Sequence, residues 1–423
     1  MDVRKTMLLL ACAACAALAA RGEMKTAPVW DLAKDAGETS AALRRDGSLP
    51  LDAAHAFTVP HTAVKDASAF TVELKMRTDA PAEKTVLSLL RQRTADTGWS
   101  LDVTLWGGIG SPISLGVNDA AFNAGWFRSR PGEVHTFTVA AKKGLVVVYW
   151  NGRLLKRFFQ VITPNLEPIS VGATRAHGAL AEMKGARLLS LKFWGPEEAF
   201  YAKGETQDFA EGFRGGPGWL MSCPTEDPAA RLPRVLLYGD SILGGYGPRL
   251  RKKLAGRAYV YTWGGFVSAA SGRTLAPKAF AAACAVRPFD VIVFNNGLHS
   301  LHWTEDKVPD ERLRDTQRQI YLNFRAGAPQ AKILWLSTTP HTAREKNAAG
   351  KVEALGALDP VVRRINRLTG EAMDAAGVPS IDGYGLLAGR LDLAAGDGYH
   401  WRGEAYDLLA DRVAEAVAAA LAK

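Results

Sequence analysis

The 423-residue sequence predicts two folded domains in series, a β-sandwich followed by an α/β domain with a parallel sheet. Residues 25–204 contain many short runs in which apolar and polar side chains alternate, the period of half-buried strands. Residues 233–423 instead alternate apolar runs with helical segments, which is the pattern of a parallel sheet with right-handed crossovers. Residues 205–232 are rich in Gly, Pro and charge, and we interpret them as a linker.

Residues 1–20 have the pattern of a secretory signal peptide. Arg4 and Lys5 precede the apolar stretch Met7 to Ala20, and Ala17-Leu18-Ala19 offers a cleavage site. This stretch is too short to span a bilayer, and no later stretch reaches ~18 apolar residues. We therefore expect a secreted or periplasmic protein without a transmembrane segment. Leu9-Leu10-Ala11-Cys12 faintly resembles a lipoprotein acylation site, so a lipid-anchored surface form is an alternative.

Charge and cysteine content restrict the classes of partner. The formal net charge is +9, and a basic surface favours anionic partners. Because the sequence has no nucleic-acid module and no dense basic run, an exported polyanion is a better candidate than nucleic acid. Outside the signal peptide the cysteines are Cys223 and Cys284, which could form a disulfide in an exported protein. The helical context of Cys284 favours a buried free thiol equally.

The strands of the first half are predicted from period-two runs and from one turn. The runs are Phe70–Met76, Leu101–Leu105, His135–Ala140, Leu145–Trp150, Leu154–Phe159 and Leu188–Phe193. Asn151-Gly152 joins two of them, and Asn-Gly between such runs is the strongest short hairpin signal. Many short strands with turn signals and almost no helix indicate a β-sandwich.

This half resembles the concanavalin A-like lectin/glucanase superfamily, especially its laminin-G-like modules. The resemblance is carried by Phe70–Leu74, by Tyr149-Trp150-Asn151-Gly152 and by the closing strand Leu189–Trp194. It implies a jelly roll, which in some members binds carbohydrate. The candidates for stacking on sugar rings are Trp99, Trp106, Trp126 and Trp150. For each of them, packing in the core or at a sheet edge is the alternative.

The second half contains the apolar runs of a five-stranded parallel sheet. These runs are Arg234–Tyr238, Ala258–Trp263, Asp290–Asn296, Lys332–Thr338 and Val378–Ile381. Helices are expected at Pro248–Leu254 and Val361–Ala376, and at the C-terminus, where Leu409, Val413, Val417 and Leu421 mark one buried face. Phosphate-loop and dinucleotide fingerprints are absent, and no Cys or His-Glu spacing supports a zinc site. We expect no cofactor and no metal.

Two short motifs supply residue types that suit nucleophilic catalysis. Gly239-Asp240-Ser241-Ile242 follows the first of these runs, and Asp397-Gly398-Tyr399-His400 precedes the terminal helix. A serine nucleophile needs an imidazole to take its proton and a carboxylate to fix the imidazole tautomer. Both motifs fall where an open α/β sheet binds ligands, outside the carboxyl ends of its strands. The alternatives are an N-cap serine and an ordinary Asp-Gly turn beside a histidine.

These motifs resemble the first and last blocks of the GDSL, or SGNH, hydrolases, and the resemblance covers roughly residues 233–423. It implies a three-layer α/β/α fold with Ser241 as nucleophile. It also implies that His400 acts as general base and then acid, and that Asp397 orients His400. The serine motif differs from the Gly-x-Ser-x-Gly elbow of α/β-hydrolases.

The two middle blocks of the family contribute donors to the oxyanion, beside the backbone of Ser241. Ser271-Gly272-Arg273-Thr274 is the best match to the second block and offers the N–H of Gly272, with Gly264-Gly265 as a rival. In the third block, Gly297-Leu298-His299-Ser300 stands where the family has Gly-x-Asn-Asp. His299 therefore replaces an amide that always donates, and it would have to present an N–H as a neutral tautomer. Asn296 is a candidate helper.

Together these features predict an exported carbohydrate esterase that removes acetyl or another small acyl group from a polysaccharide or oligosaccharide, with an anionic glycan as one option. A lipase or thioesterase of the same fold is the first alternative. A glycan-binding surface protein with a decayed hydrolase site is the second. Hydrolysis of p-nitrophenyl acetate and of a long-chain ester would separate the three.

Overall fold

The structure is a computed structural model, and it describes most of the chain. The described residues are 24, 26–52, 55–64, 66, 69–79, 85–105, 111–127, 130–142, 144–172, 175–176, 179–180, 186–195, 223–224, 226–227, 229–265, 267–270, 272, 275–299, 301 and 307–422. The predicted signal peptide, Trp106 and most of the predicted linker lie outside them. The chain divides into two compact units near residue 210, and the second unit also takes in residues 117–123 and 157–161.

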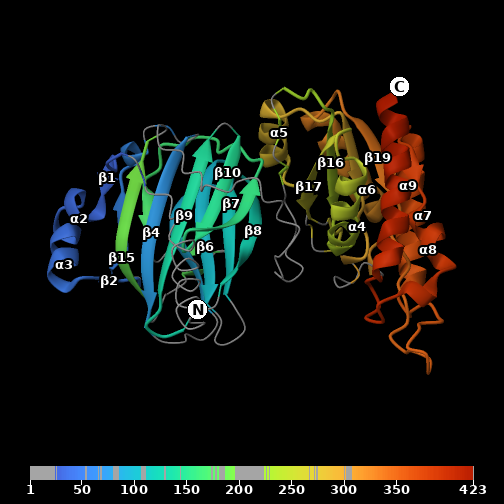
Figure 1. The fold of residues 1–423 in the computed structure, drawn as a ribbon, viewed down its shortest axis with the longest axis horizontal. Helices are drawn as coiled ribbons and strands as arrows, with labels where there is room; N and C mark the ends of the chain where they lie inside the picture. The colour runs from blue at the N-terminus through green and yellow to red at the C-terminus, as the bar shows by residue number, and fades with distance from the viewer. Residues whose placement is uncertain are drawn as a thin grey trace, which may run out of the picture. The chain divides into compact units, whose positions relative to one another are not determined.

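The first unit is built from two antiparallel sheets (Figure 1). One sheet has the order β1 (Trp30–Asp31), β15 (Ala186–Trp194), β4 (Phe70–Thr78), β9 (Val134–Lys142), β10 (Leu145–Trp150) and β11 (Arg153–Phe158), with β2 (Leu49–Pro50) beside β15. The other has the order β3 (Phe57–Val59), β12 (Ile169–Val171), β5 (Thr85–Arg93), β6 (Gly98–Leu105), β7 (Ser111–Val117) and β8 (Ala120–Phe127). A short pair, β13 (Arg175–Ala176) and β14 (Ala179–Leu180), completes the strands.

Aromatic rings from the two sheets contact one another. Phe70 of β4 lies 5.0 Å from Trp99 of β6, and Phe127 of β8 lies 5.3 Å from Phe137 of β9, measured between ring centroids. The predicted hairpin between β10 and β11 is confirmed. Asn151 and Gly152 both have positive φ, 50° and 74°, as a two-residue turn that matches strand twist requires.

One expectation for this unit was wrong. The sequence was expected to have almost no helix here, but α2 (Leu32–Asp35) and α3 (Glu38–Asp46) precede the sheets. Their ends are defined by local caps, because Asp31 accepts the N–H of Ala33 and Gly47 ends α3 in the left-handed region. Among the tryptophans considered for stacking on sugar rings, Trp99 is fully buried and donates to Gln92 Oε1 at 3.2 Å, so for this residue the alternative of core packing holds.

Trp150 is half-buried, and its indole N–H donates to Nδ1 of His135 at 3.3 Å. The side chain of Trp126 lies outside the described residues. The jelly-roll and lectin-like character of this unit remains a prediction.

The second unit contains the expected five-stranded parallel sheet, in the order β17 (Tyr259–Gly264), β16 (Arg234–Gly239), β18 (Val291–Phe294), β19 (Lys332–Leu336) and β20 (Ser380–Ile381). Strands β18 and β19 end earlier than predicted, because beyond Phe294 and Leu336 side chains rather than backbone N–H groups donate the hydrogen bonds between the two segments. Asn295 Nδ2 donates to Leu336 O at 3.0 Å, and Thr338 Oγ1 donates to Asn296 O at 2.8 Å.

The helices of this unit are α4 (Ser241–Lys253), α5 (Pro277–Val286), α6 (Asp310–Gly327), α7 (Asp359–Ala375), α8 (Gly383–Ala388) and α9 (Gly403–Ala422). Short 3₁₀ helices lie at His61–Ala63 in the first unit and at Leu391–Leu393 in the second. Helix α4 begins at Ser241 rather than at Pro248 as predicted. Its start is stabilised by Asp240, whose carboxylate accepts the N–H of Ile242 at 3.1 Å.

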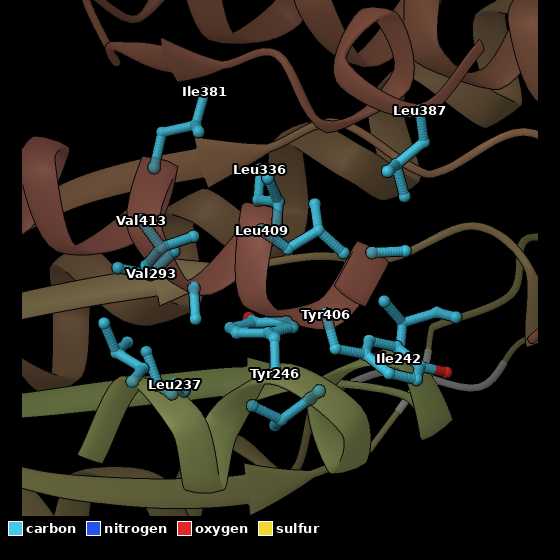
Figure 2. Packing of buried hydrophobic residues seen from close by; sticks show 14 of the residues in the cluster. Leu237, Ile242, Tyr246, Val293, Leu336, Ile381, Leu387, Tyr406, Leu409 and Val413 are labelled. Atoms are coloured by element: carbon cyan, nitrogen blue, oxygen red, sulfur yellow. The ribbon is translucent and has the colours of Figure 1, made fainter. Parts of the chain in front are cut away.

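These helices cover both faces of the sheet, which gives three layers. Helices α4 and α9 pack on the face that presents Leu237, Val293 and Leu336 (Figure 2). On the other face, Phe324 of α6 contacts Tyr238 and Phe294, each at a centroid distance of 5.5 Å.

The terminal helix is firmly packed, as its period predicted. The side chains of Leu409, Val413 and Val417 are fully buried, and burial of each contributes about 1.5–3 kcal/mol. Among the described residues, no helix combines the length and apolar character needed to cross a membrane.

Candidate active site

Ser241 is the first residue of α4, directly beyond the carboxyl end of β16. Gly239 ends the strand where there is little room, because a Cβ built there would lie 3.3 Å from Asn295 O. The chain then turns at Asp240, and the helix starts with Ser241. The first N–H groups of a helix have no partner within it and mark the positive end of its dipole. The backbone of Ser241 is thus suited to an anion.

Asp397 and His400 share one tight loop that ends at α9. Gly396 and Gly398 have φ of 88° and 94°, a region that favours glycine. Asp397 Oδ1 accepts the backbone N–H groups of Tyr399 at 2.9 Å and His400 at 2.8 Å. The loop is closed where Ala395 N–H donates to His400 O at 2.8 Å. Backbone geometry therefore fixes the carboxylate before any substrate arrives.

The structure brings Ser241, His400 and Asp397 into one hydrogen-bonded chain. His400 Nε2 lies 2.8 Å from Ser241 Oγ, and His400 Nδ1 lies 2.6 Å from Asp397 Oδ2. The side chains of His400 and Asp397 are 37% and 50% exposed, so the chain of bonds opens to solvent. This geometry fits a neutral imidazole that accepts a proton from the hydroxyl while donating to the carboxylate.

Asp397 remains ionised far into the acid range. Partial burial opposes ionisation, but the N–H groups of His400 and Tyr399 and the His400 ring outweigh it and lower the Asp397 pKa to about 2. The carboxylate is therefore charged at every pH at which an imidazole base is neutral.

Asp240 links the serine turn to the turn beyond β18. Its buried carboxylate accepts the backbone N–H groups of Ile242 and His299. Burial raises its pKa, and these hydrogen bonds oppose the rise. In the sequence, Asp240 stands out only as part of the Gly239-Asp240-Ser241-Ile242 motif. Its position just before a helix was a signal for the cap, but not for the bond to His299.

The candidate oxyanion residues differ in their surroundings. His299 is half-buried in the turn beyond β18, and Gly297 in the same turn has no room for a side chain, since a Cβ would lie 2.3 Å from Thr338 Oγ1. The amide of Asn296 is engaged on both sides by one residue. Its Oδ1 accepts Val267 N–H at 2.9 Å, and its Nδ2 donates to Val267 O at 3.2 Å.

The two glycine candidates of the second block also differ. Gly272 has φ of 67°, and the space around it is open, while Ser271, Arg273 and Thr274 lie outside the described residues. The N–H of Gly265 donates to Gly239 O at 2.8 Å. The backbone N–H of Gly265 is thus already bonded to the end of β16, so Gly272 is the better candidate for an oxyanion donor.

Residues outside the motifs hold the loop of Asp397 and His400. Thr342 N–H donates to Gly398 O at 3.0 Å, and the rings of His341 and Tyr399 are 5.1 Å apart. From α9, the Tyr406 hydroxyl accepts Trp401 N–H at 3.3 Å. No sequence pattern pointed to Thr342 or Tyr406, because each contact depends on how distant segments meet.

Within the described part of the chain, no group of three or more His, Cys, Asp or Glu side chains is placed to hold a metal ion. Cys223 and Cys284 are both free thiols. Burial raises the pKa of the Cys284 thiol to about 12, which suppresses its reactivity.

No protein-family model matches the chain, and neither does any curated protein. Solved structures similar to part of it include a GDSL-like lipase from Bacteroides thetaiotaomicron, at 16% identity and a TM-score of 0.35, covering 46% of this chain and 93% of that one. An acetylxylan esterase from Geobacillus stearothermophilus has 13% identity and a TM-score of 0.31, covering 43% of this chain and 93% of that one. At such TM-scores the similarity gives no information about activity, so the proposed activity depends on the side-chain geometry of the site.

Proposed function

We propose that the chain is a serine esterase of the SGNH/GDSL type that removes acetyl or another small acyl group from a carbohydrate. One observation carries the proposal: the bonds of 2.8 Å and 2.6 Å that connect Ser241 through His400 to Asp397 at the carboxyl edge of a parallel sheet. These three residue types in this order supply a nucleophile, a general base and the group that orients the base.

The acylation step uses the three residues in turn. Ser241 Oγ attacks the ester carbonyl carbon while its proton passes to His400 Nε2. Asp397 accepts the Nδ1–H of His400 and stabilises the imidazolium that forms. As the tetrahedral intermediate collapses, Nε2 returns the proton to the departing alcohol oxygen, and the acyl group stays on Ser241.

Deacylation repeats these moves with water. His400 takes a proton from a water molecule as the water oxygen attacks the acyl carbon. The bond to Ser241 Oγ then breaks, Nε2 gives Oγ its proton, and the carboxylic acid leaves. Asp397 stays ionised throughout, which its low pKa of about 2 supports.

Charge on the carbonyl oxygen develops near the start of α4. We propose the backbone N–H of Ser241, the backbone N–H of Gly272 and the imidazole N–H of His299 as its donors. The bond that the backbone N–H of His299 donates to the Asp240 carboxylate supports this role, because it connects the turn carrying His299 to the turn carrying Ser241. Asn296 is the weaker candidate, because its amide already bonds the Val267 backbone on both sides.

The carbohydrate part of the proposal depends on other features. The signal-peptide pattern of residues 1–20 supports export, and the lectin-like strand pattern of residues 25–204 supports a glycan partner. The solvent exposure of His400 and Asp397 suits a bulky, polar alcohol. We therefore propose a secreted or periplasmic enzyme that acts on acylated polysaccharides or oligosaccharides.

The decisive variant is Ser241→Ala, assayed by hydrolysis of p-nitrophenyl acetate and by acetate release from acetylated glycans. Loss of a serine nucleophile costs on the order of 10⁶ in kcat in the subtilisin example, so turnover should fall to background. Ser380→Ala is the matched control, because Ser380 is an exposed serine in β20. A Ser241→Ala enzyme that keeps about a tenth of the wild-type rate would exclude Ser241 as nucleophile. Faster hydrolysis of a long-chain ester than of the acetate would point to a lipase instead.

A further inference from the structure

Two cationic side chains lie directly on the loop that carries Asp397 and His400. The Cε and Nζ of Lys346 lie 2.0 Å and 2.8 Å from the place where a Cβ of Gly396 would be. Arg344 Nε lies 3.7 Å from the corresponding place at Gly398. Because residues 396 and 398 are glycines without a side chain, the Lys346 side chain packs directly against the backbone at Gly396, and the Arg344 guanidinium lies near the backbone at Gly398. The two cations therefore lie against the glycines that are four and two residues before His400 in the loop.

Both cations are exposed and keep their charge available. Among the described ion pairs, none includes Arg344, Lys346 or the nearby Arg402, whose guanidinium donates to Gly350 O at 2.7 Å. The acidic groups around the loop are mostly engaged elsewhere: Asp397 with His400, Asp392 and Glu404 with Arg390, and Glu353 with Asn347. Glu345, exposed between the two cations in sequence, is the remaining carboxylate of this segment.

The chemistry indicates which part of the substrate meets these cations. In the proposed reaction His400 Nε2 protonates the departing oxygen, so the alcohol part of the ester must lie beside the loop of His400. Groups packed on that loop flank the alcohol rather than the acyl group. Arg344 and Lys346 are thus placed to meet a negative charge on the alcohol.

We propose that Arg344 and Lys346 form an anion subsite and that the substrate is an ester of an acidic sugar, with the acyl group on a hydroxyl and the charge on a sugar carboxylate. The inference rests on the proposed esterase function and adds the substrate class. A guanidinium binds a carboxylate through a planar fork, and an ammonium adds a compact positive charge. Exposed charge pairs are weak, so each cation should change kcat/KM by about 2–5-fold at low salt.

The test compares acetylated methyl glucuronoside with its methyl ester, in which a methyl group removes the charge of the sugar carboxyl group. Acetate release gives kcat and KM for each at low and at high ionic strength. We expect the wild-type enzyme to prefer the charged substrate by about 10-fold at low salt, mainly through KM, and to lose most of that preference at about 0.5 M salt. The double variant Arg344→Gln/Lys346→Gln should lose several-fold more on the charged substrate than on its methyl ester.

Two single variants serve as controls. Glu345→Gln removes the negative charge of the same segment and should lower KM for the charged substrate, the opposite sign to Lys346→Gln. Arg318→Gln removes an exposed cation from α6 and should leave kcat and KM for both substrates unchanged.

An acetylated glucoside 6-sulfate tests whether the charge that the subsite binds is a sugar carboxylate or a sulfate. Faster turnover of the glucuronoside supports a sugar carboxylate as the charged group, and faster turnover of the sulfated glucoside overturns that assignment.

Equal losses on the charged and neutral substrates in the double variant would overturn the anion subsite, as would a wild-type enzyme without a charge preference. In both cases the esterase function would stand, because the neutral ester is still hydrolysed. A wild-type enzyme that hydrolyses neither sugar ester nor p-nitrophenyl acetate would instead overturn the proposed function, and the subsite with it.

Discussion

Gly245 lies in α4 where the ring of Tyr406, from α9, crosses the helix. A Cβ built at Gly245 would lie 2.2 Å from Tyr406 Cε1 and 2.3 Å from Cζ. Carbon atoms in contact normally stay about 3.5–4.0 Å apart, so Gly245→Ala forces the ring or a helix to move by more than about 1 Å. Tyr406 is nearly buried and its hydroxyl holds Trp401 N–H, so the ring has little freedom to move away.

The magnitude follows from two opposing effects. Overpacking of a buried site costs about 1–3 kcal/mol, and the overlap at Gly245 places this change near the upper value. Replacing a mid-helix glycine by alanine stabilises a helix by about 1 kcal/mol. The net expectation is a loss of about 2 kcal/mol, or a Tm lower by roughly 4–8 °C for a unit of this size.

The same substitution should reach the active site, because Tyr406 bonds Trp401 and Trp401 directly follows His400. A shift of about 1 Å between His400 and Ser241 can reduce kcat by about 10²-fold. Thermal and urea unfolding, together with p-nitrophenyl acetate kinetics, measure both effects.

Gly370→Ala in α7 is the matched control. A Cβ at Gly370 would meet Trp335 at 3.6 Å, which is an ordinary contact, so this variant should gain up to about 1 kcal/mol and keep wild-type kcat. If Gly245→Ala is as stable as Gly370→Ala, the packing of Tyr406 on Gly245 is not tight, and the reasoning fails.

The remaining predictions concern the reacting groups. If His299 donates to the oxyanion, His299→Ala should lower kcat by roughly 10²–10³-fold with a smaller change in KM, and His299→Asn should recover part of the loss. Steady-state kinetics on an acetyl ester decide this, and a wild-type kcat for His299→Ala would remove His299 from the mechanism. Asp397→Asn should reduce kcat less than His400→Ala does, because it disturbs the tautomer and leaves the base in place. The Asp397 pKa of about 2 lies below the usual value of about 3.9, so its charge stabilises the fold above that usual value, and the contribution is lost as pH falls towards 2. Urea unfolding of wild type and Asp397→Asn between about pH 6 and pH 2 should show a difference that shrinks over this window, and a constant difference would contradict the low pKa.

The order of the strands along the chain and the parallel sheet were readable from the sequence. Buried parallel strands such as Arg234–Gly239 are continuous apolar runs, and helices such as α9 repeat apolar residues every three or four positions. These are local patterns set by backbone geometry, so they need no knowledge of distant contacts. The same holds for the Asp397 to His400 loop, since the bonds from Asp397 to Tyr399 and His400 span only two and three residues.

Contacts between distant segments were decided by the tertiary structure. Sequence spacing could suggest that Ser241 meets His400, but only packing of α9 on the sheet brings Nε2 within 2.8 Å of Oγ. Asn296 looked like a substrate donor, yet a loop from elsewhere in the chain supplies Val267 to both ends of its amide. The start of α4 at Ser241 likewise escaped the sequence pattern.

Three glycines and a proline inside α4 argue against a helix locally, because in a helix interior each Gly costs about 1 kcal/mol and a Pro about 3 kcal/mol. The helix persists because Asp240 caps its first turn and because the missing side chain of Gly245 admits the Tyr406 ring. Local propensity is worth about a kilocalorie per residue, whereas burial of one large side chain is worth about two or more, so tertiary packing wins where the two conflict.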